Sequence, residues 1–345
     1  MLDAPDVFDV FTPSSPARLA LVDRRAITER VAAAVLTPGR QLLVYGPTGA
    51  GKTSVLQQGL DVVGEPVEVE VRRPGATVLT VGEVAEHADA ARAVGRSRLC
   101  IVYDDVHRFS EPDRRALFDH WKGVSDLATI HPGLTQIAIA AVDEPGQLGR
   151  LSLELESRLA EVEVPPMARS EVTALLEAGA AVLGIDASAV LGDLVRCSGH
   201  LPGVAHQLML DTCLDAGILR SGGVARLTAA NARAAFRIRH AAMPRRIMAK
   251  FVTFDRSADP RERLLAAQAL DLLVDAADEV VSIRRLARLV EHVYPGVGQQ
   301  DVYRAVSALT AVTVSPLVER VGDGVRFRDP LVRSHWAIAR VLGEF

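Results

Sequence analysis

The chain has 345 residues, a formal net charge of −4 and 49% apolar residues. This length predicts two or three domains, and the apolar content excludes general disorder. The small net charge excludes a strong overall attraction to nucleic acid or acidic membranes. No apolar run predicts a membrane span, and the acidic N-terminal residues are not typical of a signal peptide. The three cysteines lack Cys-x-x-Cys spacing, so we expect a cytoplasmic protein without a disulfide framework.

The N-terminal segment predicts an irregular lead-in, a helix and a buried strand. Residues 1–25 contain three prolines, and apolar side chains such as Phe8 and Phe11 are expected to hold this segment to the core. Apolar residues recur at helical spacing from Ile27 to Val35. The apolar run Leu42–Tyr45 then predicts a parallel strand that is buried on both faces.

A phosphate-loop pattern, G-x-x-x-x-G-K-[ST], follows this strand and precedes a helix expected from Ser54 to Leu60. Glycine lets the backbone approach phosphate oxygens closely, and the start of the helix presents amide donors to an anion. Lys52 is expected to reach the β- and γ-phosphates, and the Thr53 hydroxyl is expected to bind Mg²⁺. The predicted nucleotide-binding residues here are Gly46, Pro47, Thr48, Gly49, Ala50, Gly51, Lys52, Thr53 and Ser54.

Two further strands are predicted to end in carboxylates. The apolar run Leu99–Tyr103 is followed by Asp104 and Asp105, a Walker B pattern at the end of the sheet where parallel α/β folds bind ligands. Asp104 is expected to hold Mg²⁺, and Asp105 to orient or deprotonate the attacking water. A simple Asp-Asp turn is the alternative. The strand expected over 135–143 ends in Ala140 and Ala141, with only Asp143 polar, so a phosphate sensor at that tip is doubtful.

Arg158 comes just before a last apolar strand around Val162–Val164. It could be an arginine finger offered to the nucleotide of a neighbouring subunit, or a surface arginine balanced by nearby glutamates. From Ser170 the pattern is wholly helical, with helices expected over 187–197 and 204–216. A Gly-Pro turn separates them. His200 and His206 are expected to be packed or surface side chains, and an approach of either one to the nucleotide is the alternative.

Residues 216–254 contain no acid but several basic side chains. This excess predicts a phosphate or nucleic-acid patch, or pairing with acidic surfaces, or a solvated face. Three helices over 264–276, 282–293 and 299–311 and a hairpin around Gly322-Asp323-Gly324 then predict a winged helix. Its candidate recognition helix exposes an almost neutral face, so protein contact is as well supported as DNA reading. The basic residues are Arg220, Arg226, Arg233, Arg237, Arg239, Arg245, Arg246 and Lys250.

These motifs together resemble the AAA+ P-loop ATPases, in particular the STAND-like and replication-initiator-like subgroup. The resemblance implies an α/β fold: a parallel-sheet nucleotide-binding domain over 1–166, a helical lid over 167–252 and a C-terminal winged-helix domain over 253–345. It implies ATP or ADP with Mg²⁺, and adenine contacts from Val22 and Asp23. It also implies a homo-oligomer that depends on nucleotide, and a partner protein bound through the winged helix.

Asp105 stands where many AAA+ enzymes have a glutamate, and STAND-type proteins, which use nucleotide as a slow switch, resemble this chain in that respect. The lid also lacks an arginine that the resemblance would supply. The sequence therefore predicts an ATP-binding and slowly hydrolysing molecular switch. The alternatives are a DNA-binding initiator or loader ATPase, and a nucleotide-locked scaffold with negligible turnover.

Overall fold

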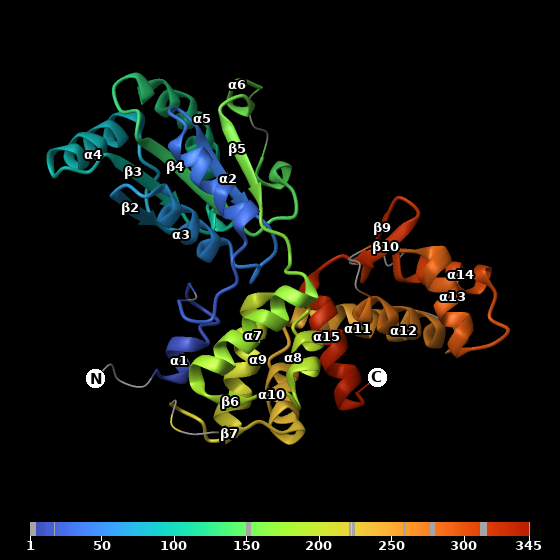
Figure 1. Cartoon of the computed structure of the whole chain (residues 1–345). Helices are drawn as coiled ribbons and strands as arrows, with labels where there is room; N and C mark the ends of the chain where they lie inside the picture. Colours follow the sequence, from blue (N-terminus) through green and yellow to red (C-terminus); the bar gives the residue numbers. More distant parts are fainter. Residues whose placement is uncertain are drawn as a thin grey trace. The chain divides into compact units, whose positions relative to one another are not determined.

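The computed structural model describes residues 5–16, 18–149, 153–220, 222, 225–257, 260–276, 280–310 and 316–344. Internal contacts divide the chain into two compact units (Figure 1). The first, here called the sheet unit, is Asp23–Pro165, and the second, the helical unit, combines Met1–Val22 with Pro166–Phe345. Among the described residues, no helix has the length and apolar character that crossing a membrane would require.

The sheet unit is built on a five-stranded sheet with strand order β2-β3-β4-β1-β5, in which every neighbouring pair is parallel. The apolar runs recognised in the sequence form its middle, because a central parallel strand is covered on both faces. This arrangement confirms the predicted α/β fold with a parallel sheet. The strands are β1 (Gln41–Tyr45), β2 (Val67–Arg72), β3 (Arg98–Tyr103), β4 (Leu134–Ala140) and β5 (Leu159–Glu163).

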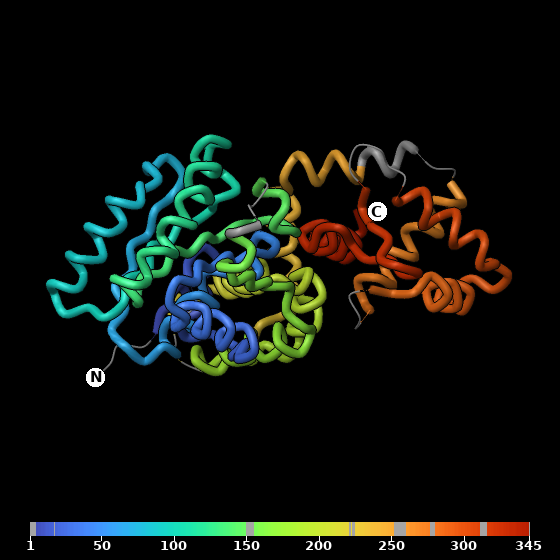
Figure 2. Tube along the Cα trace, turned by 90° about the horizontal axis from the view of Figure 1, so that it is seen from above, coloured from blue at the N-terminus to red at the C-terminus, as the bar shows by residue number. Residues whose placement is uncertain are grey.

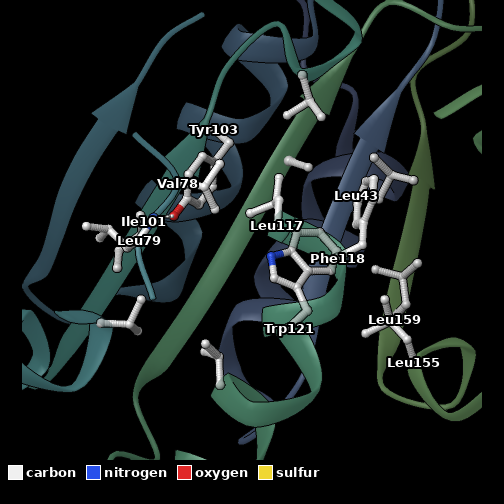
Figure 3. Close-up of a cluster of buried hydrophobic side chains, with 14 of the residues drawn as sticks. Leu43, Val78, Leu79, Ile101, Tyr103, Leu117, Phe118, Trp121, Leu155 and Leu159 are labelled. Atoms are coloured by element: carbon white, nitrogen blue, oxygen red, sulfur yellow. Dashed lines mark hydrogen bonds between the residues drawn. The ribbon is translucent and has the colours of Figure 1, made fainter. Parts of the chain in front are cut away.

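Helices cover both faces of this sheet, since successive strand residues point to opposite sides. On one side α2 and α3 pack against each other and against β1, and on the other α4 and α5 pack over β3 and β4. Figure 3 shows the second interface, where Trp121 and Phe118 of α5 lie over the sheet near Leu43. The helices are α2 (Arg25–Leu36), α3 (Lys52–Val63), α4 (Val81–Ala93), α5 (Glu111–Asp126) and α6 (Leu153–Glu156), with one-turn helices η1 (Val106–Arg108), η2 (Leu127–Thr129) and η3 (Pro145–Leu148).

The helical unit departs from the sequence prediction between 170 and 230. A short strand β6 pairs in parallel with β7, so this region is not wholly helical. The helix expected from Ala187 begins only at Leu191, because the Asp186 carboxylate accepts the Ser188 amide at 3.0 Å and holds a turn there. The elements are α7 (Arg169–Leu183), β6 (Ile185–Asp186), α8 (Leu191–Cys197), α9 (Pro202–Asp215), β7 (Ala225–Arg226), α10 (Ala229–Ala241) and α11 (Arg245–Ser257).

The N-terminal lead-in belongs to the helical unit and contains a one-turn helix, α1 (Val7–Val10). The prediction that Phe8 anchors it is wrong, because helical geometry turns that side chain outward and leaves it 53% exposed. Phe11 is fully buried. Its ring lies against Gly179 of α7, where an added Cβ would come within 2.4 Å of the ring.

The C-terminal elements of the helical unit are three helices, a hairpin and a closing helix (Figure 2). The hairpin strands β9 and β10 pair antiparallel around Gly322, and β8 adds to the β10 edge. Helix α15 packs on α8 and α10. These elements are α12 (Pro260–Asp275), β8 (Val281–Ser282), α13 (Ile283–Val293), α14 (Gln299–Thr310), β9 (Val318–Val321), β10 (Gly324–Phe327) and α15 (Pro330–Leu342). Their assignment as a winged helix stays a prediction.

Candidate functional site

The loop after β1 lies at the carboxyl end of the parallel sheet. Its first residue, Gly46, has a φ of +143°, and an added Cβ would lie 2.2 Å from the carbonyl oxygen of Val164. The Val164 amide in turn donates to the carbonyl of Tyr45 at 2.7 Å. Only glycine fits such a close backbone approach. The first position of the phosphate-loop pattern is therefore fixed by packing against the segment after β5.

Lys52 is the first residue of α3 and is only 8% exposed. Its Nζ donates to the carbonyl oxygens of Gly46 and Pro47 at 3.0 and 2.9 Å, so the loop curls around the ammonium group. Burial lowers the pKa of Lys52 to about 8, against the opposing charges of Asp105 and Asp104. A buried ammonium held by carbonyl dipoles is costly, and a phosphate would stabilise it.

The backbone around this lysine can accept an anion. Within the described residues, the amides of Lys52 and Thr53 donate to no protein acceptor, as expected for the first turn of a helix. A buried guanidinium lies beneath the loop, where Nη1 of Arg24 donates to the carbonyls of Ala50 at 3.5 Å and Pro165 at 3.0 Å. The loop is thus preorganised, and its free donors fit phosphate oxygens.

Asp104 and Asp105 follow the carboxyl end of β3, on the same side of the sheet as the phosphate loop. The Asp104 amide donates to the Arg72 carbonyl at 2.8 Å, and the Asp105 amide donates to Oδ1 of Asp104 at 3.0 Å. Burial and the neighbouring Asp105 carboxylate raise the pKa of Asp104. The Asp105 carboxylate is more exposed and forms an ion pair with Arg108 at 3.6 Å. The two carboxylates therefore have different environments, one half-buried and one open.

Thr53 and Asp104, the two predicted Mg²⁺ ligands, line one groove of about 470 Å³ between α3 and strands β2 and β3. Among the described residues, no group of three or more His, Cys, Asp or Glu side chains could hold a metal by itself. One hydroxyl and one carboxylate suit Mg²⁺, which keeps water molecules and takes its other ligands from substrate phosphates. The residues present thus fit a magnesium ion that binds together with a phosphorylated ligand.

The sequence analysis missed His107, which the structure places between Asp105 and the end of β4. The Ala141 amide donates to Nδ1 of His107 at 3.1 Å. Burial lowers the pKa of this imidazole, and the charge of Lys52 acts in the same direction while Asp105 opposes it. The signal in the sequence was a histidine three residues after the first Walker B aspartate. Its meaning depends on a contact between segments that are far apart in the chain.

Arg158 is not brought to the phosphate loop of its own chain. Its backbone carbonyl accepts the Gln41 amide at 2.9 Å, which places it at the amino end of β1, across the sheet from Lys52. The guanidinium forms a short ion pair with Asp126 and also donates to the Lys122 carbonyl at 3.3 Å. Arg158 therefore lies away from the phosphate loop of its own chain, and its role stays a prediction.

The predicted adenine contacts, Val22 and Asp23, lie where the chain passes from the helical unit into the sheet unit. Val22 is half-buried and Asp23 is exposed. Their role stays a prediction.

His200 and His206 are buried inside the helical unit, which is one of the two positions that the sequence suggested for them. The Arg333 guanidinium contacts Nδ1 of His200 at 3.3 Å, and the Thr12 amide donates to Nδ1 of His206 at 3.0 Å. Burial lowers the pKa of both imidazoles to about 4, and Arg333 adds to the effect at His200.

Part of the basic stretch 216–254 pairs with acids of the same unit. Arg220 lies 3.8 Å from Asp6, and Arg226 lies 3.4 Å from Asp186. Arg239 is half-buried, and the charge of Asp211 acts on it. Among the side chains of α10 and α11 that the structure describes, the exposed arginines are Arg233, Arg237, Arg245 and Arg246.

No family model and no curated protein sequence matches this chain. Among solved structures, Aeropyrum pernix ORC1 in complex with DNA is 17% identical, with 98% of each chain covered and a TM-score of 0.51. Aeropyrum pernix ORC2 in ADPNP–ADP complexes is 13% identical over 94% of this chain and 95% of that one, with a TM-score of 0.52. The Walker-type ATPase PABY2304 of Pyrococcus abyssi is 14% identical over 92% and 96%, also with a TM-score of 0.52. At these identities the likeness shows the fold alone, which this chain shares with the two ORC proteins and with the Walker-type ATPase.

Proposed function

We propose that this chain is an ATP-binding and slowly hydrolysing molecular switch of the AAA+/STAND type. The observation that carries the proposal is Lys52, a buried ammonium that the phosphate loop encloses, with Asp104 and Asp105 acting on it electrostatically. Solved structures of the same fold include one described as an ATPase and one in ADPNP–ADP complexes. The nucleotide state would control oligomerisation or partner binding.

Each residue has a role that follows from its position. The loop amides and Lys52 would bind the β- and γ-phosphates, while Thr53 and Asp104 would hold Mg²⁺. A bound magnesium ion supplies positive charge that neutralises the phosphate oxygens. The open carboxylate of Asp105 would orient the attacking water. Its side chain is one methylene shorter than that of glutamate, which supports slow turnover.

The position of Arg158 supports a role between subunits. It lies at the amino end of β1, whereas its own phosphate loop follows the carboxyl end of that strand, so we expect it to act on the nucleotide of a neighbouring copy. Self-association would require Arg158 to exchange Asp126 for a phosphate. We therefore propose a homo-oligomer that forms when ATP is bound, with Val22 and Asp23 contacting the adenine.

The direct experiment compares Lys52→Ala with Lys122→Ala, an exposed lysine on α5. Calorimetry of ATP and ADP binding is expected to show about a hundredfold loss or more for Lys52→Ala, because charged hydrogen bonds contribute roughly 1.5–3 kcal/mol each. Lys122→Ala should bind as the wild type does. Equal ATP affinity in all three proteins would refute the nucleotide site.

Turnover is tested separately from binding. Asp105→Asn should bind ATP and lose hydrolysis, and background turnover that is the same in wild type and variant would instead favour the nucleotide-locked scaffold. Arg158→Ala should keep ATP binding and reduce turnover only in the oligomer. An equal loss of turnover in a proven monomer would exclude the role between subunits.

DNA binding is the second candidate function, and one observation favours it. Arg320 of β9 lies over the ring of Tyr303 on α14, 4.7 Å from its centroid, and donates to the Tyr303 hydroxyl at 3.0 Å. It adds positive charge to a helix face that the sequence suggested was nearly neutral. A solved structure of similar fold is of a protein in complex with DNA. Duplex binding that weakens with salt and is lost in Arg245→Ala/Arg246→Ala would support this function, and no binding at low salt would exclude it.

A further inference from the structure

His107 is placed at the carboxyl end of β4 by an unusual backbone turn. Asp105 adopts a left-handed conformation, with φ 54° and ψ 41°, directly after β3. Aspartate tolerates this conformation better than most residues. The turn starts η1, in which Val106 is fully buried in the core. Because Val106 anchors this turn, the next residue projects toward the end of β4.

A hydrogen bond then fixes the imidazole of His107. The Ala141 amide donates to Nδ1 at 3.1 Å, so Nδ1 is an acceptor and the ring proton is on Nε2. The ring is half-buried, which disfavours a charged imidazolium. In the part of the chain that the structure describes, Nε2 forms no hydrogen bond. His107 therefore presents a neutral, oriented donor that the protein itself leaves unused.

The surroundings of this donor belong to the phosphate site. The charges of Asp105, Lys52 and Asp104 all act on the imidazole, so it lies within electrostatic range of each of them. The tip of β4 itself offers only the methyl groups of Ala140 and Ala141. A phosphate group held by Lys52 would thus meet a neutral N–H donor from the β4 side of the site.

We propose that His107 binds the terminal phosphate of ATP through Nε2–H and so lets the site distinguish ATP from ADP. The inference rests on the proposed nucleotide-binding function and names a residue that senses the terminal phosphate. A neutral donor suits this task, because it forms a charge-assisted hydrogen bond with the terminal phosphate of ATP. That hydrogen bond is absent with ADP, which lacks the terminal phosphate. The expected effect is about tenfold or more in ATP affinity.

Two substitutions separate this role from a purely structural one. In His107→Asn the side-chain oxygen can still accept the Ala141 amide at the position of Nδ1, but no donor remains at the position of Nε2. In His107→Gln an amide N–H₂ reaches the Nε2 position. The measured quantity is the ratio of the dissociation constants for ADP and for a non-hydrolysable ATP analogue, determined by calorimetry with Mg²⁺. His87→Asn on α4 is the matched control.

The expected result is that His107→Asn binds the ATP analogue about tenfold more weakly and binds ADP as the wild type does. His107→Gln should recover at least part of the preference, and His87→Asn should keep all of it. An unchanged ADP-to-ATP ratio in His107→Asn would overturn the role of His107 while leaving the proposed function intact. If the wild type binds neither nucleotide, the proposed function fails and this inference fails with it.

Discussion

Acid should weaken the helical unit through His206, which is 3% exposed and lies at the contact between α9 and the N-terminal segment. Its Nδ1 accepts the Thr12 amide at 3.0 Å, and its ring meets Phe11 edge-on, with centroids 5.8 Å apart. The hydrogen bond requires an unprotonated Nδ1, and the ring contact makes the surroundings of the imidazole apolar. Protonation would remove the acceptor and leave a charge in an apolar site.

The size of the effect follows from the pKa. Burial lowers the pKa of His206 from 6.5 to about 4 in the folded chain. The folded-state pKa is below the unfolded one, so the unfolded chain takes up the proton first. The contribution to stability is complete above pH 6.5 and falls by about 1.4 kcal/mol per pH unit toward pH 4. Between about pH 7 and about pH 4.5 the loss is about 2.5 kcal/mol.

The assay is urea unfolding followed by the fluorescence of Trp336, which is buried in the helical unit. Trp121 is replaced by Phe in every protein compared, so that the signal comes from the helical unit alone. Burial also lowers the pKa values of His200 and His335 to about 4. These two histidines are present in the parent and in the His206 variant, so they contribute equally to the pH dependence of both proteins. His206→Gln, which cannot take up the proton, should lose about 2.5 kcal/mol less than its parent on acidification. Equal losses in the two proteins would refute the reasoning.

Two further predictions concern close backbone contacts. Gly46→Ala would place a Cβ 2.2 Å from the Val164 carbonyl oxygen, so we expect this variant to lose both folding stability and ATP affinity. Gly82→Ala on α4, which has open space around it, should not destabilise the protein. The assay is the melting temperature with and without ATP, and wild-type melting temperatures for Gly46→Ala in both conditions would contradict the prediction. Gly199→Ala would place a Cβ 2.3 Å from the Pro330 carbonyl oxygen at a φ of +62°, which should loosen the packing of α15. Hydrogen exchange at the α15 amides should therefore be faster in this variant. Exchange rates equal to those of the wild type would contradict the prediction.

Local signals in the sequence indicated the residues of the candidate phosphate site. The strand before Gly46 and the strand before Asp104 are apolar on both faces, and each ends in residues whose chemistry is specific. The start of helix α4 also has a local signal, because Thr80 and Glu83 form a capping box. In such elements the local preference and the tertiary structure agree.

Features that depend on distant contacts could not be predicted. The lead-in groups with the helical unit because Phe11 packs against Gly179, and nothing near Phe11 in the sequence indicates that partner. The β6–β7 pair joins residues forty positions apart through two-residue strands, which are too short to show alternation. His107 is the corresponding case in the candidate site. The Ala141 amide, which directly follows β4, fixes the orientation of its imidazole.

The turn over 199–203 connects the helical unit's first helices to its last one. The His200 carbonyl accepts the Met167 amide at 2.9 Å, and Arg333 of α15 contacts the His200 ring and donates to the Val274 carbonyl at 2.8 Å. Ser334, next to it, donates to the Cys197 carbonyl at 2.6 Å. Displacing the turn without α15 would break the buried contact between Arg333 and His200, and a buried hydrogen bond contributes about 1 kcal/mol. We therefore expect the turn and the C-terminal helix to move together within the helical unit.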